Sequence, residues 1–180
     1  MRSVTLTLLK ALLSIPIGIG LAYPFIFAPP DAPAAGILGE LQMFGPVGSA
    51  LVIAVFLLLI LFYALDLIKT LKLVSPASRK GVRPQSVWLM FLLPYNFIED
   101  FFIVANVARS LKAEAATNPA ALAGFKSFGM VSGLGWCSAQ IVSLIPNQLG
   151  SAAGLLAIGF WVWHWVFIRR ANGALARARS

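Results

Sequence analysis

Four polar side chains within apolar sequence are the residues best suited to do chemistry. Asn96, Glu99 and Asp100 lie inside the apolar stretch 87–107, and Gln140 interrupts a later apolar run. Carboxylates and amides inside a membrane are costly, and they often mark ion or proton sites. We therefore take Asn96, Glu99, Asp100 and Gln140 as a candidate polar or ion site. The other interpretation, which we favour for the two carboxylates, is a solvated helix face at the level of the lipid headgroups, with the carboxylates paired to cytoplasmic Arg or Lys.

These residues do not suggest a catalytic centre. Adjacent carboxylates project about 100° apart on a helix, so Glu99 and Asp100 make a poor acid–base pair. The sequence also contains no phosphate-binding loop, no zinc-protease motif and no nucleophile elbow. Together these observations favour a non-enzymatic protein with no catalytic residues.

The only histidine, His164, stands among tryptophans in the run FWVWHWVF. A neutral imidazole is a good metal ligand, so one hypothesis is an axial ligand for haem or a chlorophyll-type pigment. The other is an aromatic belt at the membrane interface, just before Arg169 and Arg170. We favour the belt, and we predict no cofactor and no metal site.

Small residues recur at helical spacing in two places. Gly129 and Gly133 form one small-xxx-small pair, and Gly150 and Gly154 form another. Such pairs let two helix backbones approach closely. We favour packing between helices of the same chain over contacts with a second copy or a partner.

The composition indicates an integral membrane protein. Of its 180 residues, 59% are hydrophobic and 11% are charged, against about 45–50% and about 25% in soluble domains. The net charge of +8 comes from basic residues that flank apolar segments. That pattern is typical of membrane topology and does not indicate nucleic-acid binding. We expect a single membrane domain over residues 1–180.

Four apolar runs are close to the roughly 20 residues that a bilayer core requires. They cover about 11–27, 47–68, 128–145 and 151–168. The first run has an alternative interpretation as a signal peptide cleaved at 32–34. It exceeds the usual apolar region of about 7–15 residues, so we favour a retained span.

The distribution of charge decides how the stretch 87–107 is placed. If it stays on the cytoplasmic side, all 14 Lys and Arg residues fall on one side of the membrane, together with both termini. If it crosses, half of them move outside: Arg109, Lys112, Lys126, Arg169, Arg170, Arg177 and Arg179. The positive-inside bias therefore predicts four spans, with both termini cytoplasmic, in a bacterial inner membrane.

The segment from about 87 to 114 then needs a structure of its own. From Asn96 onward its polar and apolar residues fall on opposite helix faces, which suits a helix lying in the interface. The apolar part before Pro94 has another option, which is to enter the membrane as half of a re-entrant hairpin turning at 94–96. The predicted fold is all-α: four transmembrane helices in two hairpins, plus this cytoplasmic-side amphipathic or re-entrant helix.

Two short motifs support a family resemblance. The first, with Arg83, Pro84 and Trp88 in the order R-P-x-x-x-W, stands at 83–88, and F-x-x-P-x-N-F occupies 91–97. Over 75–176 the chain resembles an uncharacterised family of small bacterial membrane domains, with a Trp, Pro and Asn segment between two pairs of spans. The Glu99–Asp100 pair departs from that pattern. The resemblance implies the fold and no catalytic residue.

The function predicted from these observations is that of a small accessory or scaffold subunit, which packs against another membrane protein or lipid. Its expected partners are anionic lipids on the cytoplasmic face, together with a membrane-protein partner or a second copy. The alternative is a small channel or transporter, with a polar route near Asn96, Glu99 and Asp100. A weaker alternative is binding of pigment or haem through His164.

Overall fold

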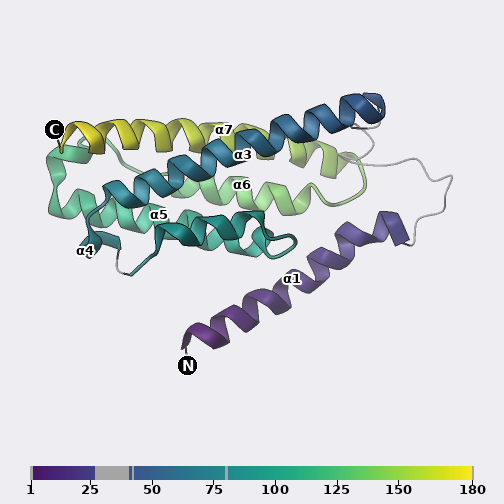
Figure 1. Cartoon of the computed structure of the whole chain (residues 1–180), viewed down its shortest axis with the longest axis horizontal. Helices are drawn as coiled ribbons and strands as arrows, with labels where there is room; N and C mark the ends of the chain where they lie inside the picture. The colour runs from purple at the N-terminus through teal and green to yellow at the C-terminus, as the bar shows by residue number, and fades with distance from the viewer. Residues whose placement is uncertain (1, 27–40, 42, 80, 180) are drawn as a thin grey trace.

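A computed structural model describes residues 2–26, 41, 43–79 and 81–179, and this part of the chain consists of helices joined by turns and loops, without strands. The predicted all-α class is therefore confirmed. Figure 1 shows the elements, which in chain order are α1 (Arg2–Ile26), α3 (Gly45–Leu73), α4 (Pro76–Arg79), η1 (Pro84–Phe91), α5 (Asn96–Thr117), η2 (Pro119–Leu122), α6 (Met130–Val142) and α7 (Gln148–Arg177).

Three of these helices are long and apolar enough to cross a membrane. They are α1, over Val4–Ala22, with α3 and α7. The expectation of a membrane protein is borne out. The predicted span 128–145 appears as α6, a shorter apolar helix of 13 residues. The proposed cleavage site at 32–34 lies outside the described residues.

The helix ends follow from local sequence. Pro46 stands in the first turn of α3, where its missing N–H has no helical partner in any case. Asn147 caps α7, because its side-chain oxygen accepts a hydrogen bond from Gly150 N at 3.1 Å. Both helices extend beyond the predicted spans at their carboxyl ends, where basic residues replace apolar ones.

The segment between the two groups of apolar helices forms a hairpin. η1 and α5 contact each other and run in opposite directions along the long axis of the molecule (Figure 1). Asn96 N donates to Leu92 O at 2.8 Å and closes the turn, which contains a cis Leu93–Pro94 peptide. The turn lies at 94–96, as predicted for the hairpin, and the choice between a re-entrant and an interfacial placement stays a prediction.

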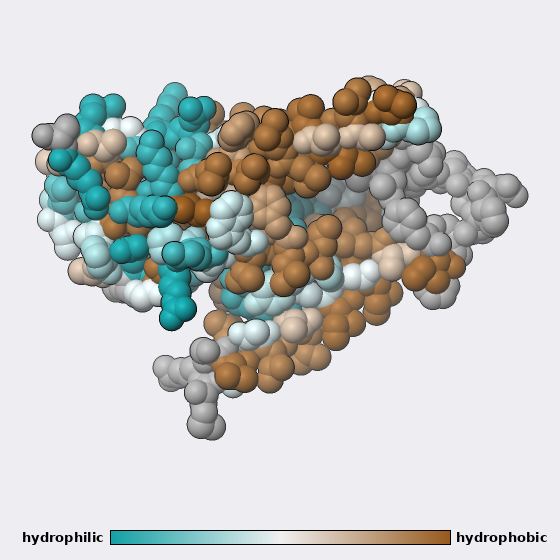
Figure 2. All heavy atoms as spheres, in the orientation of Figure 1, coloured by the Kyte–Doolittle hydropathy of each residue, from teal (hydrophilic) through white to brown (hydrophobic). Residues whose placement is uncertain are grey.

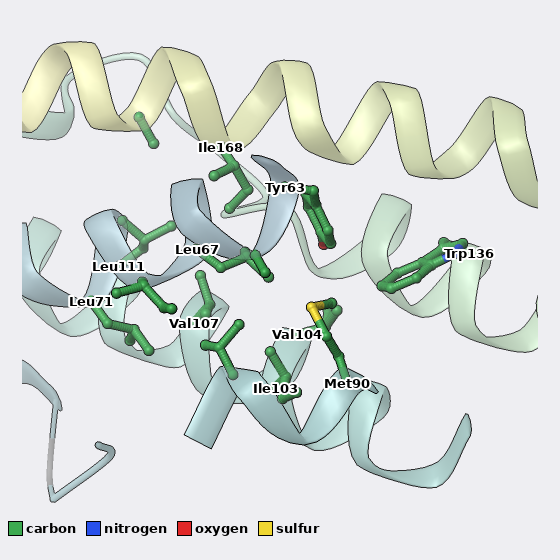
Figure 3. Close-up of a cluster of buried hydrophobic side chains, with 14 of the residues drawn as sticks. Tyr63, Leu67, Leu71, Met90, Ile103, Val104, Val107, Leu111, Trp136 and Ile168 are labelled. Atoms are coloured by element: carbon green, nitrogen blue, oxygen red, sulfur yellow. The ribbon is translucent and has the colours of Figure 1, made fainter. Parts of the chain in front are cut away.

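The core lies where α3, η1, α5, α6 and α7 meet. Figure 3 shows that it gathers Tyr63 and Leu67 of α3, Val104 and Val107 of α5, and Ile168 of α7. Tyr63, Leu67, Val104 and Ile168 are completely buried. Only the second half of α3 takes part, because the buried residues of that helix begin at Tyr63.

Polar and apolar side chains separate along the long axis. Hydrophilic residues gather at the end where α3 and α7 finish, and hydrophobic ones cover most of the remaining visible surface (Figure 2). The exposed basic residues of α3 and α7 lie near the carboxyl end of each helix: Lys69, Lys72, Arg169, Arg170 and Arg177.

Candidate functional site

Glu99 forms a buried ion pair with a residue of the first helix. Lys10 Nζ lies 2.5 Å from Glu99 Oε2, and the two residues are 8% and 5% exposed. The Lys10 ammonium also lies 3.9 Å from the centre of the Phe102 ring. The interpretation of Glu99 and Asp100 as a solvated helix face is therefore wrong. The side of α5 that carries them packs against α1 and α6.

Asp100 is brought together with Gln140, as the candidate site required. Gln140 Nε2 donates to Asp100 Oδ2 over a long 3.4 Å, and Asp100 Oδ1 has no hydrogen-bond partner. Asp100 is 2% exposed. Burial raises the pKa of this carboxyl to about 8; the hydrogen bond from Gln140 lowers it in part, and the neighbouring Glu99 raises it further.

Asn96 lies on the same helix, but its side chain takes part in neither the Lys10–Glu99 pair nor the Gln140–Asp100 hydrogen bond. It starts α5 one turn before Glu99 and Asp100, and its buried Oδ1 has no hydrogen-bond partner. The four candidate residues therefore separate into one interacting pair, Asp100 with Gln140, one carboxylate neutralised by Lys10, and one amide at the hairpin turn.

His164 lies in the packed core and is 1% exposed. Its ring packs edge-on against Tyr63 at 5.9 Å and stacks on Phe167 at 6.2 Å, and neither ring nitrogen has a hydrogen-bond partner. The aromatic-belt interpretation is wrong for His164 and for the buried Trp161, whereas Trp163 is 56% exposed. The reason is that this face of α7 packs against α3 and α6.

The small-residue pairs serve contacts within the chain. A Cβ added at Gly133 would lie 2.3 Å from Val104 Cγ1, and one at Gly129 would lie 2.7 Å from the Phe167 ring. At Gly150 the added atom would meet the carbonyl oxygen of the α6–α7 connection at 1.9 Å. Gly154 is less crowded, with its nearest neighbour, in that same connection, at 3.7 Å.

Sequence reasoning missed two members of the polar interior. They are Lys10, which directly precedes the first apolar run, and Tyr63, which lies inside the second. Tyr63 is completely buried and its hydroxyl has no hydrogen-bond partner. A signal was present for Lys10, since a charge at the start of an apolar helix needs a partner of opposite sign when it is buried.

A second polar contact joins α3 to α7. Trp165 Nε1 donates to Asp66 Oδ2 at 2.7 Å, and Arg169 lies 3.8 Å from the same oxygen. One turn further, Thr70 Oγ1 donates to Asn172 Oδ1 at 2.8 Å. Hydrogen bonds between helices of this kind fix how two spans pack.

The described part of the chain contains no group of three His, Cys, Asp or Glu side chains that could bind a metal ion. No family model, curated protein or solved structure matches this chain. The family resemblance therefore remains a prediction from the motifs at 83–88 and 91–97.

Proposed function

We propose that this is a non-enzymatic membrane protein that packs against another membrane protein as an accessory or scaffold subunit. The observation that carries the proposal is the first half of α3, where residues 50–59 are all exposed. Ten successive residues cover nearly three turns, so much of the surface of this apolar helix is uncovered by the chain itself, although Phe56 contacts the ring of Trp161. Its side chains line a hollow of about 370 Å³ formed by Leu51, Val52, Val55, Phe56 and Leu59.

α1 adds a second uncovered apolar surface. Most of its described side chains are exposed, among them Leu8 at 60% and Leu12 at 62%. The helix contacts α5, where Lys10 meets Glu99, and Figure 1 shows it lying apart from α3. We take the surfaces of α1 and of the first half of α3 as the partner surface.

The topology that goes with this proposal has four crossings, made by α1, α3, α6 with its flanking residues 128–145, and α7. α1 runs from the hydrophilic end toward the other end, α3 returns, α6 runs out again and α7 returns (Figures 1 and 2). Both termini then lie on the side of the basic residues. The positive-inside bias supports assigning that side to the cytoplasm of a bacterial inner membrane.

Anionic lipid is the second proposed partner. A hollow of about 450 Å³ at the end of α7 is lined by Val166, Arg169, Arg170, Gly173, Arg177 and the loop residue Phe125. The spacing of the α7 residues places them along one side of the helix, with an apolar residue toward the membrane core and guanidinium groups beyond it. That order suits an acyl chain and a phosphate.

Purification in native lipid particles, followed by mass spectrometry, tests the packing proposal. We expect a second membrane protein in a fixed ratio to the chain, and its loss when Leu51 and Val55 are both changed to Trp, which fills the hollow. The matched control changes Lys112, an exposed residue of α5, to Trp. A chain that is recovered alone, or only with copies of itself, contradicts the proposal.

A second candidate function is transport of protons or ions, and one observation favours it: the buried Asp100 Oδ1 without a partner. Its test is flux in liposomes that contain the purified chain. Flux that is lost in Asp100→Asn and kept in Glu114→Gln supports transport. Absence of flux in the unaltered chain contradicts it.

A further inference from the structure

The carboxylates of the described chain differ in how their charge is balanced. Glu99 is paired with Lys10, and Asp66 accepts from Trp165 and faces Arg169. Glu114 accepts two hydrogen bonds from Ser75, one from its backbone N at 3.0 Å and one from its Oγ at 2.7 Å. Asp100 differs from these three. Within the described residues, no Lys, Arg or His nitrogen lies within 4.0 Å of it.

The neighbours of Asp100 are polar but uncharged. From α6, Gln140 gives it one long hydrogen bond, and the buried Cys137 lies within electrostatic range. From α3 comes the Tyr63 hydroxyl, which is also within electrostatic range. Figure 3 shows Tyr63 pointing into the core toward Val104, the residue one turn after Asp100 in α5.

The nearby groups that titrate are already accounted for. Glu99, the neighbour of Asp100 in sequence, is held by Lys10 of α1. On α7, both nitrogens of His164 are buried and have no hydrogen-bond partner, so neither of them contacts Asp100. None of these groups supplies a positive charge to Asp100.

We propose that Asp100 is a proton-binding site, in which the buried carboxyl holds a proton as a neutral acid at neutral pH, with Gln140 and Tyr63 as its polar neighbours. An ionised carboxylate that keeps one long hydrogen bond in an apolar interior would be strongly disfavoured. Binding a proton removes that charge. It also converts one carboxyl oxygen into a hydrogen-bond donor.

The site is independent of the packing proposal, and it deepens the transport candidate by naming the proton as the species bound. A protonated Asp100 in a chain that shows no flux would leave the site intact and would contradict transport alone. The bound proton then serves the stability of the fold and is exchanged as the pH of the surrounding medium changes.

Infrared difference spectroscopy of the purified chain in lipid tests the site, because a protonated carboxylic acid has a carbonyl stretching band that a carboxylate lacks. Spectra are compared between about pH 6 and about pH 9, on either side of the pKa of about 8. We expect one such band per chain at the lower pH and its loss at the higher pH. The band should be absent throughout in Asp100→Asn.

Two further variants keep the result interpretable. Glu114→Gln removes another buried carboxyl and should leave the band unchanged. Burial alone would raise the pKa of Glu114, but the hydrogen bonds from Ser75 outweigh it and hold that pKa below its usual value. Asp100→Glu keeps the acid and should keep a band at a shifted frequency, even if the Asn variant fails to fold. No protonated-carboxyl band in the unaltered chain, or a band that persists in folded Asp100→Asn, overturns the proposal. A band that disappears at the lower pH when sodium is added would assign the site to a metal cation and would also overturn it.

Discussion

The buried Lys10–Glu99 pair should hold α1 onto the rest of the protein, and removing either partner should release that helix. The two residues are 8% and 5% exposed, so each single change leaves a charge without its partner in a buried place. Breaking a buried pair in this way costs about 3–5 kcal/mol. Contact with the Phe102 ring offsets only about 0.5–2 kcal/mol of this for an unpaired Lys10.

The lost free energy should weaken the docking of α1 and leave the core intact, because α1 contacts the rest of the protein through α5. Ser14 offers a reporter position on α1, since it is 4% exposed and its hydroxyl bonds to Lys10 O. In a Ser14→Cys background, a membrane-permeant maleimide should label slowly. In Glu99→Gln or Lys10→Met, labelling should accelerate on the order of 10²–10³-fold, which corresponds to about 3–4 kcal/mol.

The double variant Lys10→Met/Glu99→Gln provides the decisive comparison. It leaves no buried charge, so it should label more slowly than either single variant, and the cycle should give a coupling energy well above the 0.5 kcal/mol expected of independent sites. Native Cys137 is completely buried and gives the background rate. Single variants that label as slowly as the parent, or effects that simply add, would refute the assignment of the pair as a clamp.

Three other predictions concern packing, pH and topology. Gly133→Ala should lower the melting temperature, since its new Cβ is forced into α5 at a cost of about 1–3 kcal/mol, whereas Gly159→Ala, with nothing within 4 Å, should leave it unchanged or raise it. Asp100→Asn should be more stable than the unaltered chain, by a margin that grows about 1.4 kcal/mol per pH unit from the ordinary pKa of 3.8 to about 8. The raised pKa of Asp100 means that the folded state holds a proton which the unfolded state releases, so the stability of the unaltered chain is full at low pH and falls as pH rises. Thermal unfolding of both chains at each pH measures the difference in stability between them. Equal differences at pH 5 and pH 8 would contradict this prediction. Reporter enzymes fused after Glu114 and at Ser180 should both be active in the cytoplasm, and a periplasmic signal from either would rule out four crossings.

The sequence was enough to predict a membrane protein and a turn at 94–96, because composition and a proline inside an apolar stretch have direct structural consequences. The partner of Glu99 was not, since Lys10 is 89 residues away along the chain. Whether the α5 carboxylates faced solvent or protein depended on where α1 and α6 pack, and a helical wheel carries no such information.

His164 shows the same limit. The tryptophans around it predict an interfacial belt as well as they predict a buried face, and only the packing of α7 on α3 and α6 separates Trp161 from Trp163. The glycine pair at Gly129 and Gly133 was the useful signal, because it predicted a close approach within the chain. In the structure that approach makes room for the His164 ring.

Photo-crosslinking in living cells is the most direct test of the central claim, that the uncovered apolar surface of α3 contacts another membrane protein. A photoreactive amino acid is placed at Val55, which is 56% exposed on α3, and in a control at Lys112, exposed on α5. We predict a discrete crosslinked product of the chain with a second protein from Val55 and none from Lys112. Crosslinks from Val55 to lipid alone, or to further copies of the same chain, would contradict the account.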